Sequence, residues 1–159
     1  SIGENLELFV KNNLNLIWQT GISYGNQSKE LIKKIDKKGI NAHVFINEMD
    51  KAYAAADIII SRSGAIAISE LCCIAKPVIL VPSPNVAEDH QTQNAQSLVN
   101  KNAALMVKDV DASGKLVSEL VKLSENNVLQ EELSENISEL AVTNAAERIA
   151  DLALELIKK

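Results

Sequence analysis

A short corner of the sequence, Ser61–Gly64, stands between a stretch that reads as a buried strand (residues 57–61) and one that reads as a helix (residues 65–75). Gly64 has no Cβ, so it lets the backbone turn tightly and lets a ligand come close. Either serine of the corner is expected to cap the helix. A helix N-terminus carries free N–H groups and the positive end of the helix dipole, which suits an anion and above all a phosphate. The free N–H groups would be those of Ala65, Ile66 and Ala67.

Glu70 is an acid on the same expected helix, and none of its helical neighbours is cationic. The neighbours three and four residues away are Ala67, Ile66, Cys73 and Ile74, so no local salt bridge explains the acid. Glu70 follows Gly64 by six residues, about 9 Å along a helix, which is about the distance from a nucleotide's phosphates to its ribose. A carboxylate has two oxygens, and each can accept a hydrogen bond from one of two vicinal hydroxyls. Glu70 is therefore a candidate ribose ligand, and a solvated helix face is the alternative.

A second polar cluster, PSPNVAEDHQTQNA, occupies residues 82–95 and follows the next expected strand. Asp89 is expected to cap a helix in which Gln91 and Asn94 fall three residues apart, on one face of the first turn. Neutral amides donate and accept hydrogen bonds, which suits sugar hydroxyls and an acetamido group. His90 is interpreted as a capping or hydrogen-bonding residue, with a proton carrier as the alternative. No Ser–His–Asp triad, carboxylate pair or metal-ligand set can be assembled from the sequence.

The elements that must position these residues alternate between short apolar runs and amphipathic stretches. Such alternation is typical of a doubly wound, mostly parallel α/β sheet, which binds ligands at the carboxyl ends of its strands. The chain opens with an expected helix (residues 1–13) and no strand ahead of it, so the first strand of the sheet is expected to be missing. The expected strands are residues 13–19, 42–46, 57–61, 77–82 and 103–107, with helices between them and helices throughout from residue 112.

Length and composition limit the classes of protein that fit. The 159 residues suit one domain, covering residues 1–159. Aromatic residues make up only 3% and the net charge is −5 without a basic block, so a nucleic-acid partner is not expected. No apolar run approaches the ~20 residues that cross a bilayer. The adjacent Cys72 and Cys73 are expected to be reduced, buried and inert.

Residues 52–104 resemble the carboxyl-terminal domain of the MurG family of bacterial glycosyltransferases. The family pattern aDxxxxRsGAxTxsEl, then a strand and a proline, then DHQxxNA, is present in order and at matching spacing as ADIIISRSGAIAISEL and DHQTQNA. The stretches LIWQTG, HVFINEMDKAY and NAAERIADL are similar to the family as well. Ala67 departs from the pattern, since the family commonly has Thr there; this weakens a hydroxyl contact at that position but not a backbone contact.

The resemblance implies the carboxyl-terminal half of a GT-B glycosyltransferase, which holds the nucleotide sugar. The family's GGSxGA loop and its amino-terminal domain, with the catalytic base and the membrane-facing patch, are absent from this sequence. No catalytic residue is therefore expected in this fragment, and the fragment alone is expected to be inactive. The complete enzyme would transfer GlcNAc from UDP-GlcNAc to lipid I, giving lipid II, as a peripheral protein on the cytoplasmic face of the inner membrane. No cofactor and no metal bound by the protein is expected.

The resemblance also assigns roles to individual residues. Glu70 would hold the ribose hydroxyls, and the backbone of Ala65–Ser69 would line the diphosphate and the sugar. The main chain of Ile46 would meet the uracil edge, while Gln91 with Asn94 would hold the GlcNAc hydroxyls. The expected substrate-binding residues are Ile46, Ser63, Gly64, Ala65, Ile66, Ala67, Ile68, Ser69, Glu70, Gln91 and Asn94.

Two alternatives remain open from the sequence. One is another GT-B enzyme with a similar donor half, such as the catalytic subunit of the dolichol-linked GlcNAc transferase or a glycolipid galactosyltransferase. The other is a nonenzymatic nucleotide-binding domain of doubly wound form. The sequence of the DHQTQNA motif favours the MurG family.

Overall fold

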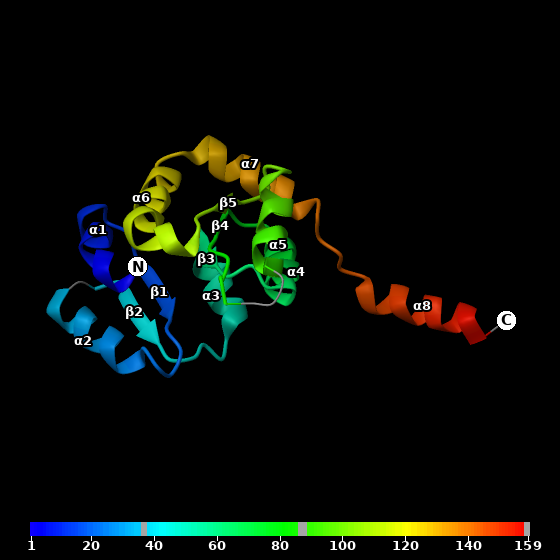
Figure 1. Ribbon diagram of the computed structural model, residues 1–159, viewed down its shortest axis with the longest axis horizontal. Helices are drawn as coiled ribbons and strands as arrows, with labels where there is room; N and C mark the ends of the chain where they lie inside the picture. Colours follow the sequence, from blue (N-terminus) through cyan, green and yellow to red (C-terminus); the bar gives the residue numbers. More distant parts are fainter. Residues whose placement is uncertain (36–37, 86–88, 158–159) are drawn as a thin grey trace.

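The computed structural model describes residues 1–35, 38–85 and 89–157, in which short parallel strands alternate with helices (Figure 1). The α/β class predicted from the sequence is confirmed. The strands are Leu16–Gln19 (β1), Ile40–His43 (β2), Ile59–Ser61 (β3), Val78–Leu80 (β4) and Leu105–Met106 (β5). The helices are Leu6–Lys11 (α1), Gly25–Ile35 (α2), Met49–Ala55 (α3), Ala65–Ile74 (α4), His90–Val99 (α5), Ala112–Ser124 (α6), Asn127–Ser138 (α7) and Ala145–Ile157 (α8), with 3-10 turns at Gly3–Asn5 (η1) and Asp109–Asp111 (η3).

Every strand pair in the described residues is parallel, as the alternation of strands and helices predicts. Strand β1 pairs with β2, and β3, β4 and β5 form a second sheet in that order. The described strands thus form two sheets rather than one continuous sheet. In the second sheet β4 is central, so β3 lies at an edge of the hydrogen-bonded ladder.

Strand β2 begins and ends earlier than the expected span of residues 42–46. Ile40 is 4% exposed and pairs with Leu16, so burial of this side chain places the strand further toward the N-terminus. Val44 and Phe45, beyond the end of the strand, are 37% and 68% exposed. The apolar residues that suggested the later strand therefore belong to the loop that carries Ile46.

The core lies on both faces of β4, whose residues are all fully buried. Ile79 joins a cluster that contains Phe9 of α1 and Leu116 of α6. Its neighbours in the strand, Val78 and Leu80, join a separate cluster on the other face. Successive side chains of a strand point to opposite faces, so this alternation places helices on both sides of the sheet. The second cluster includes Leu71 of α4, Leu98 of α5 and Ile137 of α7.

Helix α4 shows which part of the cysteine expectation holds. Cys72 is 4% exposed and packs in the core, and burial raises the pKa of its thiol above the ordinary value. Cys73 is exposed, so the expectation that both cysteines are buried is wrong. Adjacent helical residues point about 100° apart, and the core lies under only one of the two.

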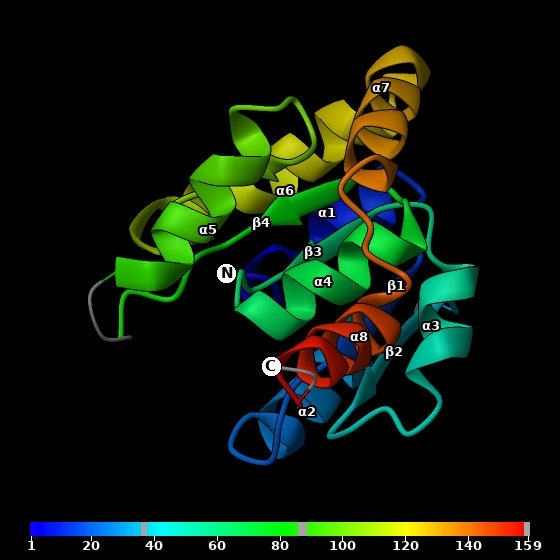
Figure 2. The same cartoon turned by 90° about the vertical axis from the view of Figure 1, so that its right-hand side faces the viewer.

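Helix α8 stands away from the rest of the domain at the end of an extended segment (Figure 1), and it lies in front of the domain when that side faces the viewer (Figure 2). None of its residues is buried. Ile149, Leu152 and Leu156 form an apolar stripe on one face of the helix and are 68%, 62% and 76% exposed. Among the residues that the structure describes, no helix has the length and apolar character needed to span a bilayer.

Candidate functional site

The corner between β3 and α4 exposes the N-terminus of a helix of ten residues. Gly64 occupies the N-cap position with extended backbone (φ −65°, ψ 150°), and no side chain caps the helix, so the prediction of a serine cap is wrong. The N–H of Ile68 donates to the Gly64 carbonyl at 2.9 Å, which makes the preceding N–H groups the ones without an intrahelical acceptor. Ala65 is exposed and Ile66 is 79% exposed, and a Cβ added at Gly64 would meet nothing within 4 Å. The turn therefore has open space in front of its N–H groups, as an anion site requires.

The two serines of the corner have other partners. The Ser61 hydroxyl donates to the carbonyl of Arg62 at 2.9 Å. The Ser63 side chain is 0% exposed, and its hydroxyl donates to the carbonyl of Gln91 at 2.8 Å. Ser63 therefore connects the start of α4 to the first turn of α5 instead of capping its own helix.

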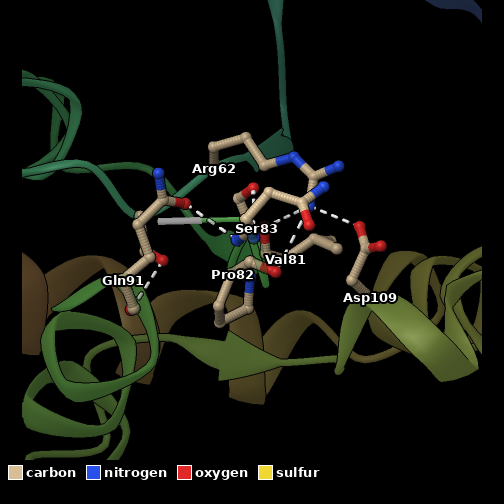
Figure 3. Close-up of polar contacts among 8 residues, drawn as sticks. Arg62, Val81, Pro82, Ser83, Gln91 and Asp109 are labelled. Carbon is tan, nitrogen blue, oxygen red and sulfur yellow. Dashed lines mark hydrogen bonds and ion pairs between the residues drawn. The ribbon is translucent and has the colours of Figure 1, made fainter. Parts of the chain in front are cut away.

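Gln91 and Asn94 are brought to the corner by two further hydrogen bonds. The backbone N–H of Ser83 donates to Gln91 Oε1 at 2.9 Å (Figure 3). Asn94 Nδ2 donates to the Ser63 carbonyl at 3.1 Å. An N–H can only donate and a carbonyl can only accept, so these partners fix which way each amide points. The atoms left for a ligand are the amide nitrogen of Gln91 and the amide oxygen of Asn94.

Arg62 holds the corner from the side opposite Gln91 (Figure 3). Its Nη1 donates to the carbonyls of Val81 and Pro82, at 3.1 and 3.3 Å, just beyond the end of β4. The same nitrogen makes an ion pair with the carboxylate of Asp109 in η3. The corner is therefore tied on one side to α5 and on the other to the loops that follow β4 and β5.

Glu70 lies on the exposed surface of α4, and its negative charge acts on Tyr53 of α3. Burial, and secondly the negative charge of Glu70, raise the pKa of the Tyr53 hydroxyl above its ordinary value. The carboxylate is accessible to a ligand, as a ribose contact requires. Sequence reasoning missed Tyr53, and the only signal for it was a lone aromatic residue in the alanine-rich stretch AYAAAD.

The remaining expected residues of α4 offer backbone more than side chains. Ala67 and Ile68 are half-buried, and Ile68 packs against the core cluster on that face of the sheet. The Ser69 hydroxyl donates to the Ala65 carbonyl at 3.0 Å, within the helix itself. Ala67 has no side-chain hydroxyl, so a hydrogen bond from this residue to a ligand can come only from its backbone.

Ile46 lies in the loop after β2, and β2 belongs to the two-stranded sheet rather than to the sheet that carries the corner. The backbone hydrogen bond of Ile46 does not connect it to the corner. Its backbone N–H donates to Gln19 Oε1 at 2.9 Å, at the end of β1. This bond occupies the Ile46 N–H, so the carbonyl is the main-chain group of Ile46 that a ligand could meet. Gln19 was also missed, although a polar residue at the carboxyl end of a predicted parallel strand was a usable signal.

Two further features do not coincide with the corner. An open surface depression of about 550 Å³ runs along α5 and is lined by Thr92, Gln96, Lys101 and neighbouring residues, none of them an expected site residue. Asp89 holds the N-cap position of α5 but accepts from the Thr92 hydroxyl at 2.6 Å, so its carboxylate does not cap the backbone. Within residues 1–35, 38–85 and 89–157, no three His, Cys, Asp or Glu side chains gather as metal ligands do.

Relatives of known name match almost the whole chain. A protein from Parabacteroides distasonis, named UDP-N-acetylglucosamine–N-acetylmuramyl-(pentapeptide) pyrophosphoryl-undecaprenol N-acetylglucosamine transferase, is 45% identical over 159 residues, which are 100% of this chain and 43% of the relative. A protein of the same name from Cytophaga hutchinsonii is 46% identical over 99% of this chain and 42% of the relative. The chain thus spans less than half the length of these relatives.

Solved structures agree in fold. The crystal structure of MurG from Acinetobacter baumannii superposes with a TM-score of 0.81 at 27% identity, over 97% of this chain and 46% of that one. The glycotransferase of kitacinnamycin superposes with a TM-score of 0.69 at 20% identity, which shows a shared fold alone. The model of the glycosyltransferase family 28 C-terminal domain matches residues 2–150. Since that match takes in both core clusters and the whole corner, the chain belongs to the glycosyltransferase family 28 C-terminal domain family.

Proposed function

We propose that this chain is the donor-binding domain of an inverting glycosyltransferase that moves GlcNAc from UDP-GlcNAc to lipid I and so makes lipid II for peptidoglycan. The names of the relatives that are 45% and 46% identical support this donor and this acceptor. The observation that carries the proposal is the corner at the start of α4. This corner combines an uncapped helix N-terminus, an exposed acid further along the helix and two oriented amides. Such groups suit the phosphates, the ribose and the sugar of a nucleoside diphosphate sugar.

Each part of the donor has a partner in this arrangement. The backbone N–H groups of Ala65, Ile66 and Ala67, which lack helical acceptors, bind the diphosphate, and Glu70 accepts hydrogen bonds from the ribose hydroxyls. Gln91 and Asn94 bind the hydroxyls of the sugar. The carbonyl of Ile46 accepts from the uracil N3–H, because its own N–H is held by Gln19.

In the complete enzyme, a hydroxyl oxygen of the acceptor sugar bonds to the anomeric carbon of GlcNAc while the bond from that carbon to the UDP oxygen breaks. UDP leaves with the electron pair, and its developing charge is met by the N-terminus of α4. The acceptor's proton goes to a base outside this chain. The chain therefore binds the donor and stabilises the leaving group, and it does not catalyse transfer unaided.

The rest of the enzyme is proposed to supply the acceptor site, the catalytic base and a peripheral contact with the cytoplasmic face of the inner membrane. The chain's match to only 43% of a relative supports this division. No cofactor, metal bound by the protein or nucleic acid takes part in the proposed reaction.

Isothermal titration of the chain with UDP-GlcNAc, UDP-glucose and ADP tests the proposal. We expect heat from UDP-GlcNAc, weaker binding of UDP-glucose and none of ADP. A preference for UDP-glucose would favour another GT-B transferase, and binding without preference among the nucleotides would favour a nonenzymatic nucleotide-binding domain. No binding of any uridine nucleotide would refute the proposal.

The substitution Glu70→Ala tests the ribose contact. Hydrogen bonds to a charged group contribute about 1.5–3 kcal/mol, so we expect UDP to bind roughly 10- to 150-fold more weakly. Glu131→Ala, at an exposed acid of α7, is the matched control and should leave binding unchanged. Equal affinity of the Glu70→Ala variant and the unmodified chain would remove this residue from the site.

A further inference from the structure

We propose that Ser63 is a positioning residue for recognition of the donor sugar: its side chain touches no part of the ligand, and it holds in place the turn of α5 that carries the two amides that do. The inference rests on the proposed function, because it concerns how that site recognises the sugar of the donor. The Ser63 side chain is 0% exposed, so its hydroxyl cannot reach a ligand in front of the corner.

The contacts of Ser63 converge on the first turn of α5. Its hydroxyl donates to the Gln91 carbonyl at 2.8 Å, and its own carbonyl accepts from Asn94 Nδ2 at 3.1 Å. Ser63 thus bonds to the backbone of Gln91 and to the side chain of Asn94. These bonds join positions 28 and 31 residues apart, so no local structure of α5 would replace them.

The resulting polarity suits a sugar hydroxyl. Ser83 occupies the Gln91 oxygen and Ser63 occupies the Asn94 nitrogen, so Gln91 presents an N–H donor and Asn94 presents a C=O acceptor. The two residues are three apart on one helical face, which places donor and acceptor side by side. A hydroxyl both donates and accepts, so the pair matches the hydroxyls of a hexose. The Ser63 carbonyl orients the Asn94 amide, and the Ser63 hydroxyl holds the turn of α5 that carries both amides.

The diphosphate site is independent of the Ser63 hydroxyl. It is built from backbone N–H groups that begin after Gly64, and those groups are fixed by α4 itself, beginning with the bond from Ile68 to Gly64. Removing the hydroxyl therefore loosens the sugar contacts and leaves the nucleotide contacts in place. Loss of the Ser63 hydroxyl should therefore weaken binding of the sugar nucleotide but not of the nucleotide alone, a difference that a merely structural role would not produce.

The test compares UDP with UDP-GlcNAc in calorimetric titrations of the unmodified chain, Ser63→Ala and Ser63→Cys. One neutral hydrogen bond accounts for roughly a three- to tenfold change in an equilibrium constant. We expect Ser63→Ala to weaken UDP-GlcNAc by about that factor and to change UDP by less than twofold. Ser63→Cys keeps a weak donor of similar size and should fall between the two. The matched control, Ser28→Ala, removes a hydroxyl that is equally buried and bonds only within α2, and both affinities should stay unchanged.

The outcomes separate this inference from the proposed function. If the unmodified chain binds UDP-GlcNAc more tightly than UDP and Ser63→Ala weakens both equally, or neither, the positioning role is refuted while the proposed function stands. If the unmodified chain binds no uridine nucleotide, the proposed function fails and this inference fails with it. Circular dichroism and the unfolding midpoint confirm that each variant is folded; an unfolded Ser63→Ala leaves Ser63→Cys to decide by the same comparison of the two ligands.

Discussion

The bonds of Arg62 predict that its two carbonyl contacts stabilise the domain more than its ion pair does. The ion pair is partly solvated, because the side chains of Arg62 and Asp109 are 53% and 36% exposed, and such pairs contribute about 0–1 kcal/mol. Val81 is only 6% exposed, and its carbonyl accepts from Arg62 at 3.1 Å. Leaving a buried acceptor without its partner costs about 1–3 kcal/mol.

We therefore expect Arg62→Ala to lower the free energy of unfolding by about 1.5–3 kcal/mol and Asp109→Ala by less than about 1 kcal/mol. Urea unfolding followed by circular dichroism measures both values. For a chain of this size each kcal/mol moves Tm by about 2–4 °C, so thermal scans distinguish the variants as well. Lys122→Ala is the matched control, because Lys122 and Glu119 form an ion pair with side chains 70% and 36% exposed.

Salt separates the two contributions further. An ion pair at the surface is screened at high ionic strength, whereas hydrogen bonds to carbonyls are not. In about 1 M salt, the cost of Asp109→Ala should shrink toward that of Lys122→Ala, and the cost of Arg62→Ala should stay largely as it was. If Asp109→Ala destabilises the chain as much as Arg62→Ala does, the carbonyl contacts are not what holds this corner, and the reasoning fails.

Two further expectations concern other parts of the chain. In the folded protein a thiol reagent should modify Cys73 quickly and Cys72 only after urea is added, because one is exposed and the burial of the other raises its pKa; labelling of both at equal rates would contradict this. Gly39→Ala should lower the free energy of unfolding by about 1 kcal/mol or more, since Gly39 has φ +99° and an added Cβ would lie 2.0 Å from Asn15 Oδ1; an unchanged urea midpoint would show that the backbone adapts.

Local pattern was enough to predict the order of the elements and the corner between β3 and α4, whereas the binding roles of the residues there stay predictions. Short β-branched runs such as IIIS and VILV lie between amphipathic stretches, and each became a parallel strand. The corner was predictable because a glycine and polar residues separate an apolar strand from an apolar helix. Glu70 was predictable as an accessible acid because its helical neighbours offer no cation.

Contacts between distant residues were not predictable from the same pattern. Ser63 carries the residue type of a helix cap, but its hydroxyl bonds to a carbonyl 28 residues later. Ile46 was expected to offer its main chain, but only the structure shows that Gln19, 27 residues away, takes its N–H. The end of β2 was misplaced because Val44 and Phe45 are apolar although exposed, and burial depends on what packs above a strand. Local residue propensity does not include these contacts between residues far apart in the sequence.

Helix α8 has the periodicity of a helix that covers a core, yet it removes no side chain from water within the described part of the chain. Hydrophobic stabilisation follows the apolar area that is buried, so these 13 residues add almost nothing to the free energy of folding. A helix of that length is marginal by itself in water. Among the described residues, Leu140 and Ala141 are the last that pack against a core cluster, so the cooperatively folded unit ends before α8 begins at Ala145.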